Sequence, residues 1–276
     1  MEEARGDAGL SQADLEVVHR IADAFNQRDA DAVWGLTNGE LEFRSTLVDL
    51  QGDSGIYRGR DDVDRYFRDL DEVIEDWQIR DHVCIDAGEG CVLLVYRVAG
   101  RGRGSGVPLD HEFGIVWRLR DGRLVSGDTY SNPEEALAAA GFDRSFLGDV
   151  QNMRDVTAAI GAKDLGALAP LIHPDAVWEH NLGSGSVEEG VYRGRESIVG
   201  LFARLVDAWE YMQPRSRDVV PGPAGTFHVR GELHSKHRAT EAEVVTPYEQ
   251  ALEVKNGMLF RGRMSLGASE VSAYAE

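Results

Sequence analysis

The chain carries an internal repeat at a constant offset. Residues 57–60, Tyr-Arg-Gly-Arg, recur as residues 192–195. The same offset puts the turn dipeptide Asp121-Gly122 on Asn256-Gly257. Aromatic positions align in the same way: Phe43 with Trp178, Phe67 with Phe202, and Phe113 with Tyr248. Agreement at both turn and core positions predicts two copies of one domain.

The copies are predicted to occupy residues 1–141 and 146–276. The chain has 276 residues, which is nearer to two domains than to one at about 150 residues per domain. Solenoid repeats are much shorter, at about 20–50 residues, so each copy is expected to be a globular domain. Apolar residues make up 42% of the chain, which is enough to build ordinary globular cores.

The charge balance limits the partners. Asp and Glu number 48 against 29 Lys and Arg, which gives a net charge of −19. Nucleic acid is not expected as a partner, because phosphate binding requires clustered positive charge. The acidic start of the chain lacks the apolar core of a signal peptide, and no apolar run approaches the roughly 18 residues of a membrane span. We therefore expect a cytoplasmic protein that does not enter membranes, with Cys84 and Cys91 as free thiols.

Both copies show the same order of elements. Helical spacing, period-two alternation and turn residues predict helix, helix, strand, helix and then four strands. In copy one the first strand, residues 40–45, places Phe43 and Ser45 on one face. The helix that follows is expected to bury Tyr66 and Phe67. This order predicts an α+β fold in which a curved antiparallel sheet wraps around helices and leaves a cone-shaped interior.

Three motifs carry a resemblance to a known family. They are residues 191–196 (Val-Tyr-Arg-Gly-Arg-Glu), residues 173–180 (His-Pro-Asp-Ala-Val-Trp-Glu-His), and Asp121-Gly122 followed by residues 132–137 (Asn-Pro-Glu-Glu-Ala-Leu). With them the chain resembles the SnoaL-like branch of the nuclear transport factor 2-like superfamily, once per copy. The resemblance implies two tandem cone-shaped α+β barrels, each with a pocket between helices and sheet. That superfamily holds isomerases, cyclases, epoxide hydrolases, dehydratases and non-catalytic binders, so the fold alone does not select a function.

Strand periodicity selects the side chains that would face such pockets. Alternate residues of a strand share a face, so residues 109–119 direct one set of side chains inward in copy one. The predicted lining residues are Phe43, Ser45, Tyr66, Phe67, His111, Phe113 and Trp117 in copy one, and Trp178, Phe202 and Trp209 in copy two. Copy one is the more aromatic, so its pocket is expected either to bind a flat apolar ligand or to be filled by its own side chains.

The resemblance also indicates where acid–base chemistry would take place. The base position of the superfamily's ketosteroid isomerases falls on Ser45 in copy one and on His180 in copy two. The position of the partner acid falls on Ile115 and Gln250. Copy one therefore lacks the isomerase set, and copy two has polar groups of another kind. An imidazole, with a reference pKa of about 6.5, accepts a proton near neutral pH, while Gln250 and Tyr248 can donate hydrogen bonds to a developing oxyanion.

His180, Gln250 and Tyr248 are accordingly the predicted catalytic residues. The alternative for His180 is a structural histidine bonded to a backbone carbonyl or placed at a pocket rim. The alternative for Gln250 and Tyr248 is a buried network that satisfies itself. The epoxide hydrolases of this superfamily use a pair of inward carboxylates, and the corresponding positions here hold no such pair.

No metal or cofactor is expected. His228 and His234 alternate with apolar residues along one strand and belong to its solvated face, and His237 points the other way. The expected partner is an apolar small-molecule ligand or substrate. Residues 91–98 are apolar on both faces, so one face would meet the pocket and the other a second sheet. We predict that the copies pack as an intramolecular pseudo-dimer, or that the chain forms a homodimer.

Three functions remain open from the sequence. The first is a small-molecule enzyme of the cyclase or isomerase kind, which uses acid–base chemistry without a cofactor in an apolar pocket. The second is a non-catalytic binding or accessory protein for an apolar small molecule. The third is a scaffold or accessory subunit whose pockets are vestigial. The few carboxylates in the predicted pockets favour binding, whereas an inward His180 favours catalysis.

Overall fold

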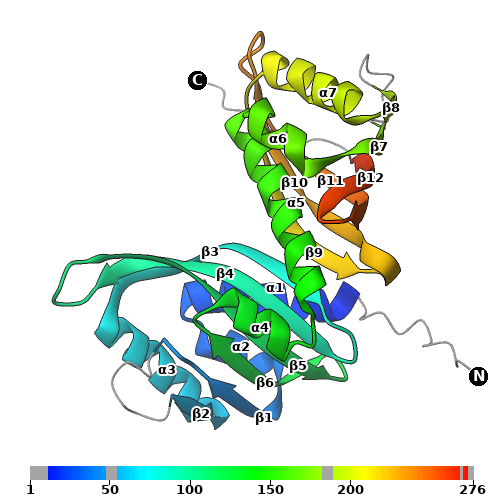
Figure 1. The fold of residues 1–276 in the computed structure, drawn as a ribbon. Helices are drawn as coiled ribbons and strands as arrows, with labels where there is room; N and C mark the ends of the chain where they lie inside the picture. Colours follow the sequence, from blue (N-terminus) through cyan, green and yellow to red (C-terminus); the bar gives the residue numbers. More distant parts are fainter. Residues whose placement is uncertain (1–11, 48–54, 182–188, 268–269, 273–276) are drawn as a thin grey trace, which may run out of the picture. The chain divides into compact units, whose positions relative to one another are not determined.

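The computed structural model describes residues 12–47, 55–181, 189–267 and 270–272 (Figure 1). The chain divides into two compact units, with unit 1 ending at Asp143 and unit 2 beginning at Arg144. Each unit combines helices with a sheet, which confirms the predicted α+β class. The limits 1–141 and 146–276 stay a prediction about which segments fold independently. Within the described ranges, no helix has both the length and the apolar character needed to cross a membrane.

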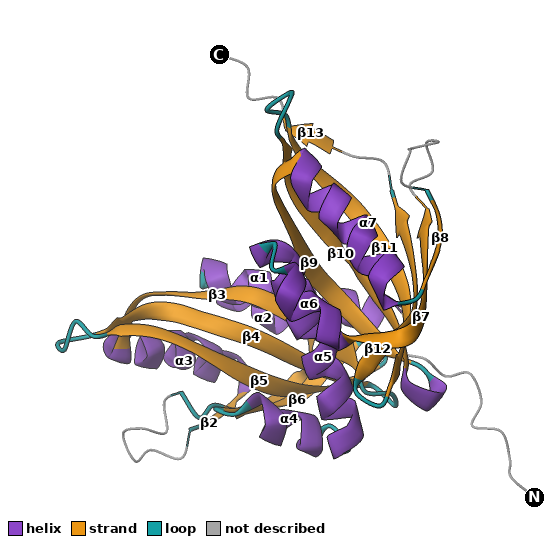
Figure 2. Cartoon of the chain, turned by 45° about the horizontal axis from the view of Figure 1, so that its top comes forward, coloured by secondary structure: helices purple, strands orange, loops and turns teal. Residues whose placement is uncertain are grey.

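Unit 1 follows the predicted order of elements. In chain order they are α1 (Gln12–Gln27), α2 (Ala30–Gly35), β1 (Thr37–Arg44), β2 (Ile56–Arg58), α3 (Gly59–Val73), β3 (Ile74–Asp86), β4 (Cys91–Gly102), β5 (Pro108–Arg120), β6 (Arg123–Tyr130) and α4 (Pro133–Ala139). The strands are ordered β2-β1-β6-β5-β4-β3 across the sheet. Helices α1, α2 and α3 cover one face (Figure 2). Helix α4 covers the other, because the outward side of Gly114 meets Ala136 of α4.

Unit 2 repeats this plan. Its elements are α5 (Arg144–Ala162), α6 (Leu165–Leu171), β7 (Ile172–Asn181), β8 (Gly190–Arg193), α7 (Arg195–Ala208), β9 (Trp209–Pro221), the 3-10 turn η2 (Pro223–Gly225), β10 (Thr226–His237), β11 (Glu243–Lys255), β12 (Met258–Leu266) and β13 (Glu270–Ser272). The strand order β9-β10-β11-β12-β7-β8 matches that of unit 1 strand for strand, and β13 pairs with β11. Helices α5, α6 and α7 pack on this sheet.

Each sheet is mixed, which corrects the expectation of a wholly antiparallel sheet. Strand β1 runs parallel to β6, with Phe43 beside Gly127. Strand β7 runs parallel to β12, with Trp178 beside Gly262. Strands β3 to β6 and β9 to β12 are the antiparallel runs that short hairpins allow. Strands β1 and β6 lie far apart in sequence, so no hairpin fixes their relative direction.

The repeat extends to unusual backbone conformations. Arg28 and Lys163, which are equivalent positions of the repeat, both have positive φ, at 53° and 59°. Each follows the first helix of its unit. Each also donates hydrogen bonds to the strand that follows the third helix, which is β3 in unit 1 and β9 in unit 2. Arg28 donates to the Trp77 carbonyl at 2.9 Å, and Lys163 donates to the Trp209 carbonyl at 2.7 Å. A cation at this position therefore ties the first helix to the sheet in both units.

An aspartate caps the second helix of each unit. Asp29 accepts a hydrogen bond from the Ala32 amide at 2.8 Å, and Asp164 accepts one from the Ala167 amide at 2.9 Å. Losing such a cap typically costs about 1 kcal/mol, so Asp164→Ala should lower the free energy of unfolding by about that amount in urea denaturation. Asp175→Ala, at an exposed strand position, is the control. Equal stability of the two variants would contradict the capping role.

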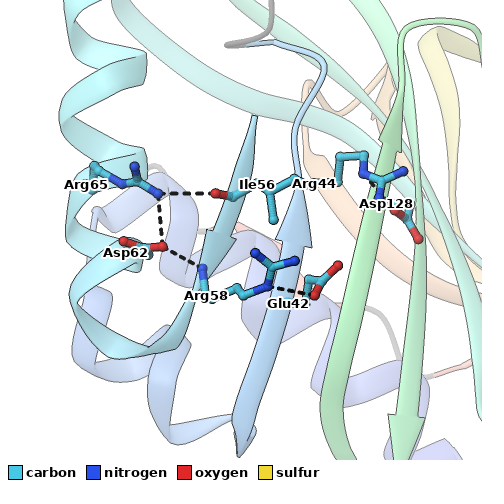
Figure 3. A network of polar contacts seen from close by, with 7 residues as sticks. All are labelled: Glu42, Arg44, Ile56, Arg58, Asp62, Arg65 and Asp128. Atoms are coloured by element: carbon cyan, nitrogen blue, oxygen red, sulfur yellow. Dashed lines mark hydrogen bonds and ion pairs between the residues drawn. The ribbon is translucent and has the colours of Figure 1, made fainter. Parts of the chain in front are cut away.

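Polar contacts fix where α3 begins in unit 1 (Figure 3). The Arg58 amide donates to the Asp62 carboxylate at 2.7 Å, and Arg65 donates to the same carboxylate at 2.9 Å. Arg65 also donates to the Ile56 carbonyl at 3.2 Å, and Arg58 pairs with Glu42 of β1 at 2.9 Å. Exposed ion pairs add little stability. These contacts join the start of α3 to β1 and β2, and the opposite side of α3 buries Tyr66 and Phe67.

Candidate functional site

In unit 2, burial along β7 and β11 alternates as predicted from strand periodicity. On β7, Trp178 and His180 are buried. On β11, Tyr248 is buried and Gln250 is half-buried, while the intervening Glu249 is exposed. No bulge interrupts β7 or β11 at these residues, so alternate side chains stay on the same face. The two-residue repeat of a strand therefore predicted these faces correctly.

The interior of unit 1 is filled by aromatic rings. Phe25 of α1 lies at the centre, with its ring centroid 6.1 Å from Phe43, 5.8 Å from Tyr66, 5.6 Å from Phe67 and 6.4 Å from Trp117. Phe43 and Trp117 stack at 5.6 Å. We call these five residues the aromatic cluster. Four of them are predicted lining residues, and the structure places them in contact with one another. This agrees with the second of the two predictions for copy one, a pocket filled by its own side chains.

The two polar residues predicted for this pocket differ in position. Ser45 is buried beside the Tyr66 hydroxyl. Burial raises the pKa of Tyr66, so Tyr66 stays protonated at neutral pH. His111 is exposed and bonded through Nε2 to the Ser131 carbonyl at 2.8 Å. This corrects its expected inward placement.

The cause is the position of His111 along β5. Its ring packs edge-on against Phe113 at 4.8 Å, so the two share a face as period two requires. Phe113 is buried and stacks on Tyr96 at 5.9 Å, but the strand before it, including Pro108 and Asp110, is exposed. His111 therefore lies on the predicted face of β5, but at an end of the strand that extends beyond the core.

In unit 2 the imidazole of His180 is buried next to an indole. His180 is 5% exposed. The Trp178 Nε1–H donates to His180 Nδ1 at 3.4 Å, a long and therefore weak hydrogen bond. A neutral ring that accepts at Nδ1 carries its proton on Nε2. The Trp178 ring lies 5.7 Å from Phe202 of α7, so Trp178 and Phe202, both predicted lining residues, form one apolar wall.

Tyr248 forms a second polar feature of unit 2. Its hydroxyl lies 3.1 Å from the Ser216 hydroxyl of β9. Gly231 lies between them on β10, and a Cβ there would come within 2.8 Å of the Tyr248 hydroxyl oxygen. Burial raises the pKa of Tyr248 and Ser216 opposes this less strongly, so Tyr248 is a hydrogen-bond donor at neutral pH. Ser216 was not predicted, because only the tertiary pairing of β9 with β10 brings it here.

The three predicted catalytic residues do not surround one point. Gln250 pairs with Met264 of β12, and Met264 pairs with His180 of β7. Two strand spacings therefore separate Gln250 from His180, roughly 10 Å. Tyr248 turns the other way, toward β9. The structure thus arranges the polar groups along a line across the sheet, with His180 at one end.

Trp209 occupies a different position from the one expected. Helix α7 ends at Ala208, so Trp209 is the first residue of β9. It is half-buried, and its ring packs edge-on against His237 at 5.1 Å. The sequence analysis predicts Trp209 as a lining residue of copy two, and the structure places it against His237 at the start of β9.

Two matched positions are less buried in unit 2 than in unit 1. Ile21 of α1 is 0% exposed, whereas its counterpart Val156 on α5 is half-buried. Ile115 of β5 is 1% exposed, whereas its counterpart Gln250 is half-buried. Two side chains that are fully buried in unit 1 are therefore replaced in unit 2 by side chains that keep partial contact with solvent.

A surface hollow of about 470 Å³ lies in unit 1, away from the predicted site residues. It is lined by Arg28, Asp71, Asp76, Trp77, Gln78 and Arg103. The Arg28 guanidinium lies 4.1 Å above the Trp77 ring, and Trp77 Nε1 donates to Asp71 at 2.8 Å. Arg103 also donates to the Asp71 carbonyl. These groups satisfy one another, so the hollow offers no net binding charge.

The histidines of β10 lie as predicted. His228 is exposed, and His234 Nε2 lies 3.2 Å from Glu232 on the same strand. They belong to the solvated face of the strand rather than to the interior of unit 2.

Comparison with known protein families gives one match in each half of the chain. The model of the SnoaL-like domain matches residues 18–127 and 153–262, which together exceed half of the chain. The chain belongs to the SnoaL-like domain family. Its two SnoaL-like domains begin at equivalent positions of the sequence repeat, since residue 18 corresponds to residue 153.

Three similar solved structures each match less than half of the chain. A protein of unknown function from Burkholderia pseudomallei, described as NTF2-like, is 18% identical, with 46% of this chain and 95% of that chain covered and a TM-score of 0.39. An epoxide hydrolase from M. tuberculosis is 14% identical, with 44% and 84% covered and a TM-score of 0.38. A protein from Catenulispora acidiphila with a ketosteroid isomerase-like fold, solved with trimethylamine, is 14% identical, with 41% and 82% covered and a TM-score of 0.37. Among curated proteins, no match is found.

Proposed function

We propose that unit 2 binds an apolar small molecule and acts on it by acid–base chemistry without a cofactor, as a cyclase or isomerase does. One observation carries the proposal. At matched positions, Ile21 and Ile115 are fully buried in unit 1, while Val156 and Gln250 are half-buried in unit 2. Small-molecule sites combine apolar walls with a few placed polar groups, and unit 2 has the apolar wall of Trp178 and Phe202 beside the buried His180.

His180 is the proposed proton-transfer residue. It is buried against Trp178, so an apolar ligand beside it would exclude water from the imidazole. While Trp178 donates to Nδ1, the ring offers the N–H of Nε2, which suits the role of acid or hydrogen-bond donor. The role of base requires Nδ1 to be released. The bond of 3.4 Å is weak enough for that exchange.

The remaining polar groups are proposed to hold the other end of the ligand. Gln250 lies roughly 10 Å from His180, two strand spacings away. Tyr248 and Ser216 offer hydroxyl donors further along the same face. Donors of this kind stabilise a carbonyl oxygen as it gains charge. The arrangement suits an elongated molecule with a carbonyl or hydroxyl group remote from the reacting carbon.

Unit 1 is proposed to be a structural copy without a ligand. Its aromatic cluster occupies the space that a ligand would need. The pairing of the copies as a pseudo-dimer, or of two chains as a homodimer, stays a prediction that solution scattering can test.

A ligand-capture experiment tests the proposal. Native mass spectrometry and displacement of a hydrophobic dye should show one ligand per chain. Val156→Trp, which would fill the accessible interior of unit 2, should abolish binding, because the added ring occupies the ligand's place. Ser45→Ala is the control in unit 1 and should bind as the wild type does. Loss of ligand binding in both variants, or in neither, would contradict the placement of the ligand in unit 2. Binding without turnover of any captured compound would favour a binding or accessory protein.

A further inference from the structure

Two histidines and a cysteine gather between α1 and β3 of unit 1. His19 Nδ1 lies 3.1 Å from His82 Nε2, and Cys84 Sγ lies 3.7 Å from the same His19 nitrogen. His19 is 3% exposed and Cys84 0% exposed, while His82 is half-buried. None of the three belongs to the aromatic cluster or to the proposed site of unit 2. We call them the His-His-Cys cluster.

A local irregularity in β3 brings the cluster together. The pairing of β3 with β4 shifts between Arg80 and Val83, and Asp81 has a positive φ of 48°. After this bulge, His82 and Cys84 both lie against His19 of α1. Bulges redirect side chains in this way and are found next to functional sites.

Two of the donor distances match those of a zinc site. Zinc binds imidazole nitrogen at about 2.0–2.1 Å and thiolate sulfur at about 2.3 Å, in tetrahedral geometry. Two nitrogens on one zinc ion are then about 3.3–3.4 Å apart, and a nitrogen and a sulfur about 3.6 Å. The observed 3.1 and 3.7 Å, both measured from His19 Nδ1, lie within a few tenths of an ångström of these values. Binding of one ion by all three residues requires the half-buried His82 ring to turn toward Cys84.

The charges nearby favour a cation. The negative charge of the Asp86 carboxylate attracts a divalent cation to this part of unit 1. Asp86 lies two residues after Cys84 and so on the same side of the strand.

We propose that His19, His82 and Cys84 bind a zinc ion. Binding releases the thiol proton of Cys84, and the proton shared between the two rings moves to the other nitrogen of the ring that carries it. Three protein ligands leave a fourth position of the tetrahedron, on the solvent side where His82 is half-buried, for water or another group.

Metal uptake by the full-length chain tests this proposal. The protein is dialysed against zinc and then metal-free buffer, and the metal is counted by mass spectrometry. Cobalt(II) serves as a spectroscopic probe, because a thiolate ligand gives a charge-transfer absorption. We expect one ion per chain, and Cys84→Ser should remove the absorption and lower zinc affinity by at least about tenfold. Cys91→Ser, at the other buried cysteine, should retain both.

His82→Ala provides a second variant that is less dependent on folding. His82 is half-buried, so its removal disturbs the core less than removal of Cys84. It should also lower zinc affinity while circular dichroism stays unchanged. Absence of zinc from the wild type after dialysis would overturn the proposal. So would equal affinity of wild type and His82→Ala, or a cobalt absorption that survives in Cys84→Ser.

Discussion

Replacing His180 with alanine is expected to reduce turnover of the captured ligand by about 10²–10⁴-fold, the usual contribution of a general acid or base. His180 is a buried imidazole on the inner face of unit 2, and alanine cannot transfer a proton. Binding should change less than turnover, because Trp178 and Phe202 keep the apolar wall. Steady-state kinetics with kcat and KM determined separately measures the effect.

Two further variants separate proton transfer from other roles of His180. His180→Gln keeps a hydrogen-bonding side chain without a titrating group, so it should be as slow as His180→Ala. Trp178→Phe removes the N–H that occupies His180 Nδ1, so it should shift the pH profile of kcat rather than abolish activity. A His180→Ala enzyme as active as the wild type, with Ser45→Ala impaired instead, would move the chemistry to unit 1.

Replacing Trp117 with alanine is expected to lower the free energy of unfolding by about 3–5 kcal/mol, as removal of large buried aromatics does. Trp117 is 0% exposed and stacks on Phe43 within the aromatic cluster. Its ring also covers Gly127, where a Cβ would overlap it. The loss of contacts and the cavity that remains both lower the free energy of unfolding of the variant. Urea denaturation followed by circular dichroism gives the measurement.

Trp209→Ala is the matched control, because the same side chain is removed from a half-buried position at the start of β9. Trp209→Ala should lower the free energy of unfolding clearly less than Trp117→Ala does. If Trp117→Ala costs no more than the control and weakens binding of a flat apolar compound, unit 1 holds a ligand site and the filled interior is wrong.

The sequence by itself determined the repeat and the inward faces. One constant offset is visible in the motifs and reappears in the limits of the two SnoaL-like domains. Period two placed Trp178, His180 and Tyr248 on buried faces. These features depend on local chain geometry, since neighbouring residues of a strand must point to opposite sides wherever the strand lies. Helix caps such as Asp164 are local in the same sense.

Features that depend on distant segments were decided only by the tertiary structure. The parallel pairing of β1 with β6 joins strands that no hairpin connects. His111 has the predicted phase but lies at an exposed end of β5, because strand periodicity says nothing about how far the core extends.

The glycines at 127 and 262 show the same division between local and tertiary information. They occupy equivalent positions of the repeat, and each lies under a tryptophan ring. In unit 1 the ring is Trp117 from β5, and in unit 2 it is Trp178 from β7. The repeat locates both glycines, but only packing decides which neighbouring strand supplies the ring. That exchange of large side chains accompanies full burial of Ile115 in unit 1 and partial exposure of Gln250 in unit 2. How tightly side chains fill a core is a property of the assembled structure.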